Sequence, residues 1–250
     1  MIGMGKADFM YRDYIFDLYG TLVDIRTDEE RAVLWKKTAR YYALQGAQYS
    51  PAEIKKRYGE LVAEKERQLA GRMKAPCRDV EIKLEDVFAR LFREKGVKPS
   101  KRQVFDACLF FRNESLCYIR LFPGAKKLLQ RLKEAGKGVY LLSNAQRIFT
   151  EPEMRMLGIY DLFDGILYSS DCGVKKPSPL FFDRLFEKFG LEKQNAVMIG
   201  NDCEADVGGA HAYGLASMYV HTNQSTPLRG ALPADCKRLA SIGEAFGIAD

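Results

Sequence analysis

The chain has 250 residues, of which 47% are hydrophobic and 29% are charged, a composition typical of folded globular proteins that excludes a largely disordered chain. Its six cysteines include no Cys-x-x-Cys pair and it has only two histidines, which argues against a disulfide framework, a structural zinc site and most serine–histidine chemistry. The net charge is +6, and the positive surplus is concentrated in residues 25–120.

Several partner classes are excluded or favoured by these features. No apolar run approaches the ~18 residues of a membrane span, and the N-terminal residues lack the pattern of a secretory signal. We therefore expect a cytoplasmic protein with no membrane partner. The basic segment favours a small anionic metabolite as ligand, although lysines on solvated helix faces would give the same surplus. No zinc-finger or RNA-binding motif accompanies the charge, so we expect no nucleic-acid partner. The aromatic-rich segment 41–111 is compatible with either a monomer or a homodimer.

The first element is a short apolar run at residues 14–18, which predicts a buried strand ending in a tight turn at Gly20. From residue 27 to residue 116 the pattern is helical, and no strand is predicted in it. Asp28 is the expected cap of a helix through Leu44, and Ser50 opens a capping box with proline at the first helical position. Two further helices are predicted at residues 79–92 and 100–116.

After residue 124 the predicted elements alternate between helix and strand. The expected helices cover residues 125–134, 151–157, 179–189 and 206–213, and the expected strands cover residues 138–142, 165–168, 196–199 and 216–220. Such alternation predicts an α/β fold with a doubly wound parallel sheet. The helical segment leaves this sheet after its first strand. We therefore predict a core made of residues 1–24 and 121–250 and an inserted all-helical cap made of residues 25–120.

Polar side chains follow four of the predicted strands, where sites form in such sheets. They are Asp17 and Thr21 after the first strand, Ser143 and Asn144 after the second, Lys175 and Lys176 after the third, and Asn201, Asp202 and Asp206 after the fourth. A carboxylate, hydroxyls, lysines and an acidic cluster are thus expected to meet at one edge of the sheet.

The segments that carry these residues are FDLYGTLVD (16–24), LSN (142–144), KKPSPLF (175–181) and IGND (199–202) with Asp206. They resemble the four motifs of the haloacid dehalogenase superfamily, and residues 25–120 resemble its helical cap of the first type. The resemblance covers residues 13–24 and 121–246 for the sheet. It implies a hydrolase that acts through a covalent intermediate on an aspartate.

The resemblance implies a role for each matching residue. Asp17 would be the nucleophile, since a carboxylate can attack phosphorus or carbon. Thr21, Ser143 and Lys176 would complete the catalytic set, with Lys176 preferred to Lys175 because it directly precedes Pro177. Tyr19, Asn144 and Lys175 are expected to bind substrate. The expected Mg²⁺ ligands are Asp17, the backbone carbonyl of Tyr19, Asn201 or Asp202, and Asp206, although Asp206 could instead cap the following helix.

Tyr19 departs from the phosphatase pattern, in which a second aspartate protonates the leaving group. Tyrosine at this position resembles the 2-haloacid dehalogenases, whose halide leaving group needs no proton. Against that reading, Trp35 is followed by two lysines rather than by the expected halide-binding arginine, and Asp202 favours a metal. We expect a Mg²⁺-dependent phosphatase that prefers good leaving groups. The alternatives are a metal-free 2-haloacid dehalogenase-like enzyme and a non-catalytic protein that binds a phosphorylated metabolite.

Overall fold

The computed structural model describes residues 9–227, 230–243 and 246–247. In this part of the chain, six strands form one sheet in the order β5-β4-β1-β6-β7-β8. They are β1 (Asp13–Phe16), β4 (Gly138–Ser143), β5 (Gly165–Tyr168), β6 (Ala196–Gly200), β7 (Ala216–Val220) and β8 (Lys237–Leu239). Neighbouring strands are parallel throughout. The predicted α/β fold with a parallel sheet is confirmed, and β1 lies between β4 and β6.

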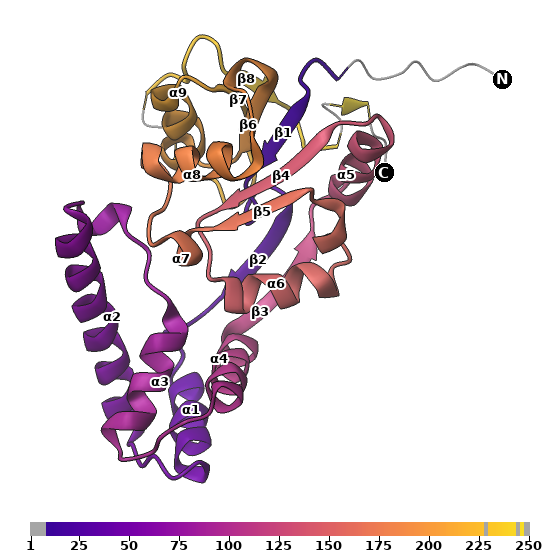
Figure 1. Cartoon of the computed structure of the whole chain (residues 1–250). Coiled ribbons are helices and arrows are strands. Elements are labelled where there is room, and N and C mark those ends of the chain that lie inside the picture. Colours follow the sequence, from indigo (N-terminus) through magenta and orange to yellow (C-terminus); the bar gives the residue numbers. More distant parts are fainter. Residues whose placement is uncertain (1–8, 228–229, 244–245, 248–250) are drawn as a thin grey trace.

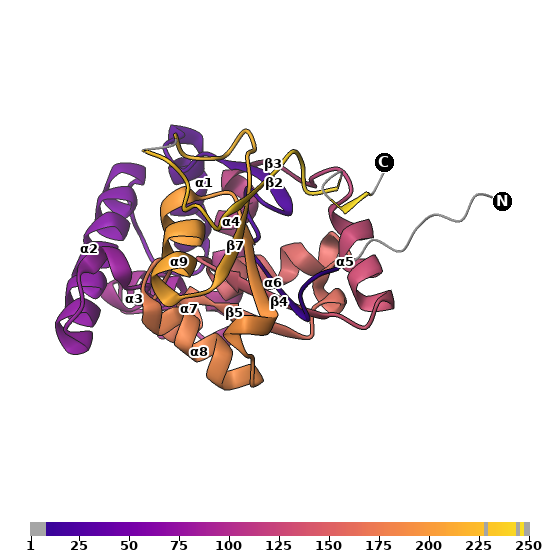
Figure 2. The ribbon, with the colours of Figure 1, turned by 90° about the horizontal axis from the view of Figure 1, so that it is seen from above.

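Helices cover both faces of this sheet (Figures 1 and 2). They are α5 (Ala125–Glu134) and α6 (Arg147–Met156) on one face, and α8 (Pro179–Phe189) and α9 (Gly209–Tyr213) on the other, with α7 (Ser169–Cys172) following β5. Successive side chains of a strand point to opposite faces. Accordingly, Tyr14 and Phe16 pack in the core under α5, whereas Ile15 packs with the phenylalanines of α8. Both faces are apolar because both are buried.

The predicted helical segment forms four helices, grouped at one end of the molecule in Figure 1. They are α1 (Ala32–Leu44), α2 (Pro51–Met73), α3 (Leu84–Glu94) and α4 (Lys101–Ser115). Capping boxes begin α2 at Ser50 and α4 at Ser100. Their shared core includes Trp35, Tyr42, Phe88, Phe92 and Phe111. Among the helices that the structure describes, none combines the length and apolarity needed to cross a membrane.

Two helices of the segment begin later than predicted. Asp28 does not cap α1, because its carboxylate accepts a hydrogen bond from the Glu30 amide in a turn that precedes the helix. The predicted start at Asp79 is a separate 3₁₀ turn, Cys77–Asp79, and α3 follows after an extended stretch. Further 3₁₀ turns lie at Tyr160–Leu162 and Lys193–Asn195.

The expectation that the segment contains no strand is wrong at both of its ends. β2 (Val23–Thr27) pairs with β3 (Leu116–Leu121) in an antiparallel ribbon that joins the helices to the sheet. The two crossings between core and helices therefore lie side by side and share backbone hydrogen bonds. The division into core and cap at residues 24/25 and 120/121 stays a prediction, and these boundaries fall inside the ribbon.

Candidate active site

The end of β1 places Asp17 at the edge of the sheet. The strand ends at Phe16 rather than Leu18, so Asp17 lies just beyond it, and its amide donates to the Ile199 carbonyl over 2.9 Å. The chain then turns sharply at Gly20, whose φ is +84°. A Cβ at this glycine would lie 2.4 Å from Asn201 Nδ2, so only glycine lets the loop pass against Asn201.

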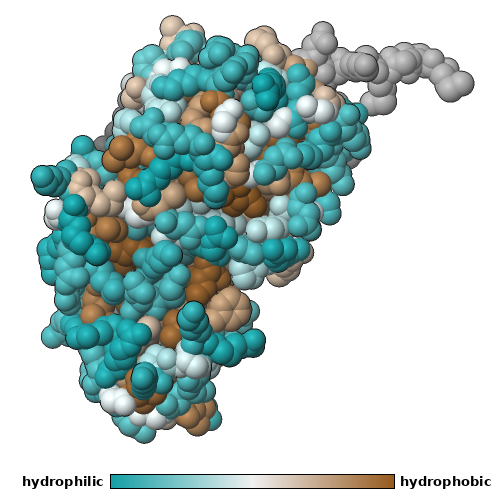
Figure 3. Space-filling model, viewed as in Figure 1, coloured by the Kyte–Doolittle hydropathy of each residue, from teal (hydrophilic) through white to brown (hydrophobic). Residues whose placement is uncertain are grey.

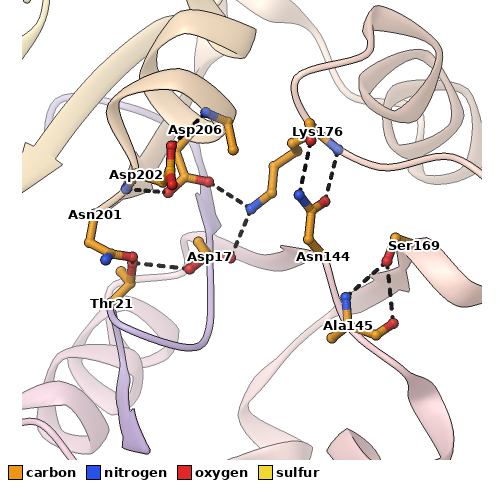
Figure 4. A network of polar contacts seen from close by, with 10 residues as sticks. Asp17, Thr21, Asn144, Ala145, Ser169, Lys176, Asn201, Asp202 and Asp206 are labelled. Atoms are coloured by element: carbon orange, nitrogen blue, oxygen red, sulfur yellow. Dashed lines mark hydrogen bonds and ion pairs between the residues drawn. The ribbon is translucent and has the colours of Figure 1, made fainter. Parts of the chain in front are cut away.

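Lys176 connects the two carboxylates of the site (Figure 4). Its Nζ lies 2.8 Å from Asp17 Oδ1 and 2.7 Å from Asp206 Oδ1. All three side chains are buried. Asp206 reaches this position by passing over Gly200, where a Cβ would lie 2.1 Å from Asp206 Oδ2. Residues from three separate strand ends thus form one buried charge cluster.

The electrostatics of this cluster follow from its charge balance. Burial alone would lower the pKa of Lys176, but the carboxylates of Asp17 and Asp206 outweigh it and raise that pKa. Burial also raises the pKa of Asp206, although Lys176 opposes the shift. One lysine serves two carboxylates, so the cluster carries one unit of net negative charge when both carboxylates are ionised.

Thr21 and Asn201 complete the group that the sequence predicted. The Thr21 hydroxyl lies 3.3 Å from Asp17 Oδ2 and 3.1 Å from Asn201 Oδ1. Ser143 is buried at the end of β4. The side chain of Asn144 holds the Lys176 backbone, accepting from its amide over 2.8 Å and donating to its carbonyl over 2.9 Å. Asn144 therefore positions Lys176 by holding its backbone.

The Asp202 carboxylate and the Lys175 backbone amide bond to groups outside the Asp17 cluster, although the Asp202 amide donates to Asp206 Oδ2 over 2.9 Å. Asp202 Oδ1 accepts from the Glu204 and Ala205 amides over 2.9 and 2.8 Å, which caps the π-helical turn Cys203–Gly208. The backbone amide of Lys175 donates over 2.9 Å to the carbonyl of Asp79, in the 3₁₀ turn that precedes α3. Of the two lysines before Pro177, Lys176 is the one that reaches Asp17.

Tyr19 makes contacts that the sequence did not predict. Its hydroxyl donates to Glu153 Oε2 and lies 3.0 Å from Thr150 Oγ1, both on α6. Glu153 in turn accepts from Arg112 of α4, with 2.6 Å between Arg112 Nε and Glu153 Oε1. Burial, and secondly the charge of Glu153, raise the pKa of Tyr19 well above its ordinary value, so the phenol stays protonated.

Arg112 and Glu153 look like ordinary helix residues in the sequence, because only the packing of α4 against α6 brings them to Tyr19. No local motif marks either of them. Their ion pair joins the helical segment to the helix beside the nucleophile.

A cavity of about 560 Å³ lies between the helical segment and the sheet. Its lining includes Tyr19, Asn144, Arg112, Glu29, Glu81, Arg26, Thr27, Gln146, Phe149, Thr150 and Gln224. Tyr19 and Asn144 place one wall of the cavity next to the Asp17 cluster. The arrangement provides a nucleophilic carboxylate, a lysine and a hydroxyl to hold an anion, and space for an attached group.

The donors around Asp17 fit a hard cation. Among the residues that the structure describes, no three His, Cys, Asp or Glu side chains converge to hold a metal ion. The oxygen donors at this edge include the carboxylates of Asp17 and Asp206, the amide oxygen of Asn201, the Thr21 hydroxyl and the backbone. An oxygen-only set with a surplus negative charge suits Mg²⁺, which uses few carboxylates and keeps several waters.

Comparison with known proteins gives consistent matches. The family model of haloacid dehalogenase-like hydrolases matches residues 13–214. The glyceraldehyde 3-phosphate phosphatase of Pyrococcus abyssi is 28% identical over 132 residues, which are 53% of this chain and 56% of that protein. The chain thus spans about half the length of the curated relatives it matches.

Solved structures with the same fold include enzymes of both kinds. The 2-haloacid dehalogenase from Pseudomonas syringae pv. Tomato DC3000 has a TM-score of 0.62 and 18% identity, covering 94% of this chain and 96% of that one. The HAD phosphatase from Thermococcus onnurineus has a TM-score of 0.56 and 18% identity, covering 93% and 95%. At this identity the structures show a shared fold.

Proposed function

The chain belongs to the haloacid dehalogenase-like hydrolases, and on this basis we propose that it is a phosphatase acting on a small phosphorylated metabolite through an aspartyl-phosphate. The observation that carries the proposal is the cluster of Asp17, Lys176 and Asp206, in which a nucleophilic carboxylate lies beside a buried cation and a second carboxylate. The phosphatase named among its relatives supports it.

In the proposed reaction, an Asp17 oxygen attacks phosphorus, and the bond from phosphorus to the alcohol oxygen breaks. Lys176, Thr21 and Ser143 hold the phosphoryl oxygens, whose negative charge is spread in the transition state. A water molecule then attacks the phosphorus of the aspartyl-phosphate, which releases phosphate and restores Asp17. Asn144 keeps Lys176 in place through its two backbone hydrogen bonds.

We propose that Asp17, Asn201, Asp206 and the Tyr19 carbonyl would hold Mg²⁺. When bound, the ion supplies positive charge that balances the phosphoryl oxygens. Asp202 is the weaker candidate, because one of its oxygens already accepts two backbone hydrogen bonds.

The position of Tyr19 explains the expected preference for good leaving groups. Its hydroxyl donates a hydrogen bond to Glu153, and its raised pKa makes it a poor acid. No second aspartate stands two residues after Asp17, so the leaving alcohol receives its proton from water. General acid catalysis contributes roughly 10²–10⁴-fold, and esters of acidic alcohols need it least.

The dehalogenase alternative has one feature in its favour, which is Tyr19 itself. Against it, Arg112, the arginine of the cavity that lies beside Tyr19, is already paired with Glu153. It is therefore poorly placed to receive a halide. Trp35 lies in the helical core, where its indole donates to the Glu29 carbonyl over 2.7 Å.

The two chemistries differ in where solvent oxygen goes. Water attacks phosphorus in an aspartyl-phosphate, but it attacks the carbonyl carbon of Asp17 in an aspartyl ester formed on carbon. During turnover of p-nitrophenyl phosphate in H₂¹⁸O, we expect label in the released phosphate and none in the Asp17 peptide by mass spectrometry. Label in Asp17 after incubation with 2-chloropropionate, without phosphate release from the ester, would support the dehalogenase instead.

A further inference from the structure

We infer that the cavity beside Asp17 selects phosphate esters whose alcohol part is uncharged or positively charged, and that Glu29 is a residue that determines this specificity. The inference rests on the proposed phosphatase function and narrows its substrate class. The inference concerns the alcohol part of the ester, which remains after the phosphoryl group is transferred. The cavity must hold this part.

Four charged side chains line the cavity: Arg26, Glu29, Glu81 and Arg112. Of the two arginines in the lining, Arg112 is the one next to Tyr19, since its guanidinium lies over the Tyr19 ring at 5.8 Å. It is neutralised by Glu153, through bonds of 2.6 Å from Nε and 3.3 Å from Nη2. Both partners are largely buried, so this pair is held firmly and offers little net charge to a ligand.

Arg26 is the other cation, and it is exposed at the edge of the cavity. Water screens an exposed charge strongly, so its attraction for a second anionic group is weak. The cations of the lining therefore do not form an anion-binding pocket.

Glu29 lies in the segment between β2 and α1 and is partly buried in the lining. Among the described residues, its carboxylate has no hydrogen-bond or ion-pair partner, although its backbone carbonyl accepts from Trp35. Burial raises the pKa of Glu29, and the charge of Arg112 limits that rise. A partly desolvated carboxylate of this kind gains from a ligand hydroxyl or ammonium and repels a ligand carboxylate.

Glu81 adds a second acceptor to the lining. Its carboxylate accepts from Gln146 Nε2 over 2.9 Å and from Ser169 Oγ over 3.2 Å. The remaining polar lining consists of amides and hydroxyls, such as Asn144, Thr27 and Gln224. Neutral hydrogen-bonding groups beside two carboxylates suit a polyol or an amino alcohol.

The positive surplus of the helical segment does not reach this cavity. Lys36, Lys37 and Arg40 of α1 are exposed and are not among the lining residues. Lys37 pairs with Glu114 over 2.7 Å. Figure 3 shows hydrophilic side chains over much of the surface of this part of the molecule. The lining itself carries two arginines and two glutamates, so its own charges balance and the basic surplus of the segment lies outside it.

The test compares kcat/KM for three small esters: glycerol 3-phosphate, phosphoethanolamine and phosphoglycolate, whose alcohol parts are neutral, cationic and anionic. We expect the wild-type protein to favour the first two over phosphoglycolate by at least about tenfold. Glu29→Gln keeps the size of the side chain and removes its charge, and it should reduce this preference about fivefold. The matched control is Glu30→Gln, since Glu30 is exposed, pairs with Lys55 and does not line the cavity.

The outcomes separate this inference from the proposed function. Hydrolysis of p-nitrophenyl phosphate with a preference for phosphoglycolate would overturn the inference and leave the phosphatase function intact. The same holds if Glu29→Gln and Glu30→Gln change the preference equally. An absence of p-nitrophenyl phosphate hydrolysis in all variants would overturn both.

Discussion

Tyr19 is the residue that most separates this chain from a phosphatase with a second aspartate. Its side chain is turned to α6, where its hydroxyl donates a hydrogen bond to Glu153, and Arg112 of α4 lies over its ring. The phenol thus serves to hold α4 and α6 together beside the nucleophile. Because a tyrosine stands here, the site lacks the general acid that an aspartate would supply.

Replacement of Tyr19 by aspartate should restore a proton donor for the leaving alcohol. We expect Tyr19→Asp to raise kcat for an alkyl phosphate such as glycerol 3-phosphate by about tenfold or more, within the range of general acid catalysis. Turnover of p-nitrophenyl phosphate, whose leaving group needs little protonation, should change much less. The control is Tyr19→Phe, which removes the same hydrogen bond to Glu153 without supplying an acid. Equal effects of both variants on the alkyl ester would contradict this role.

The residues of the Asp17 cluster were predictable, whereas those of the cavity were not. Asp17, Thr21, Lys176, Asn201 and Asp206 each follow a strand at a fixed place in a motif, so the order of the strands brings them together. Glu29, Arg112 and Glu153 lie in no motif. Their meeting depends on how helices distant in sequence pack, and the sequence gives no local signal for that.

Among the elements, the β2–β3 ribbon carries the connection between the helical segment and the sheet. It was missed because its two strands are about 90 residues apart and form a separate two-stranded sheet. One signal was present, since Val23 to Thr27 alternates apolar and polar residues as a half-exposed strand does. We overlooked this signal because a long helical pattern follows it directly.

Asp24 of β2 fixes this ribbon to the loop after β7. Its carboxylate accepts from Arg120 Nε at 2.9 Å, Tyr118 Oη at 3.1 Å, Gln224 Nε2 at 2.8 Å and Asn223 Nδ2 at 3.2 Å. Burial alone would raise the pKa of Asp24, but these hydrogen bonds outweigh it and lower that pKa. Four donors thus surround one buried carboxylate and join both strands of the ribbon to the loop.

The lowered pKa of Asp24 sets a pH dependence of stability. Because the folded-state pKa lies below the unfolded value of 3.8, the contribution is complete above pH 3.8 and is lost as the pH falls through the folded-state pKa. We expect Asp24→Asn to lower the free energy of unfolding by about 1–2 kcal/mol at pH 7. In urea titrations this deficit should shrink below pH 3.8.

The control for Asp24→Asn is Asp106→Asn, on the exposed face of α4, where the pair with Arg102 is open to solvent. This variant should change stability little at any pH between 3 and 7. A deficit of Asp24→Asn that stayed constant down to pH 3 would contradict the assignment of its effect to the charged carboxylate.

For the molecule as a whole, the parallel sheet followed from the sequence because its strands are short apolar runs separated by glycine-terminated helices. Whether such a segment forms a strand or a helix depends mainly on the residues within that segment. The three-residue strand β8 at the sheet edge was not predicted, since two of its residues are exposed and lack an apolar run. The shape and charge of the cavity could not be predicted in this way, because they depend on contacts between residues far apart in the sequence.

The central claim is that Asp17 and a divalent cation together transfer a phosphoryl group to water. The most direct test is phosphate release from p-nitrophenyl phosphate by the purified protein, with Mg²⁺, with EDTA, and with Asp17→Asn as the blank. We predict turnover that is lost on chelation, restored by added Mg²⁺ and absent in Asp17→Asn. No phosphate release by the wild-type protein with Mg²⁺, or equal release by Asp17→Asn, would contradict the claim.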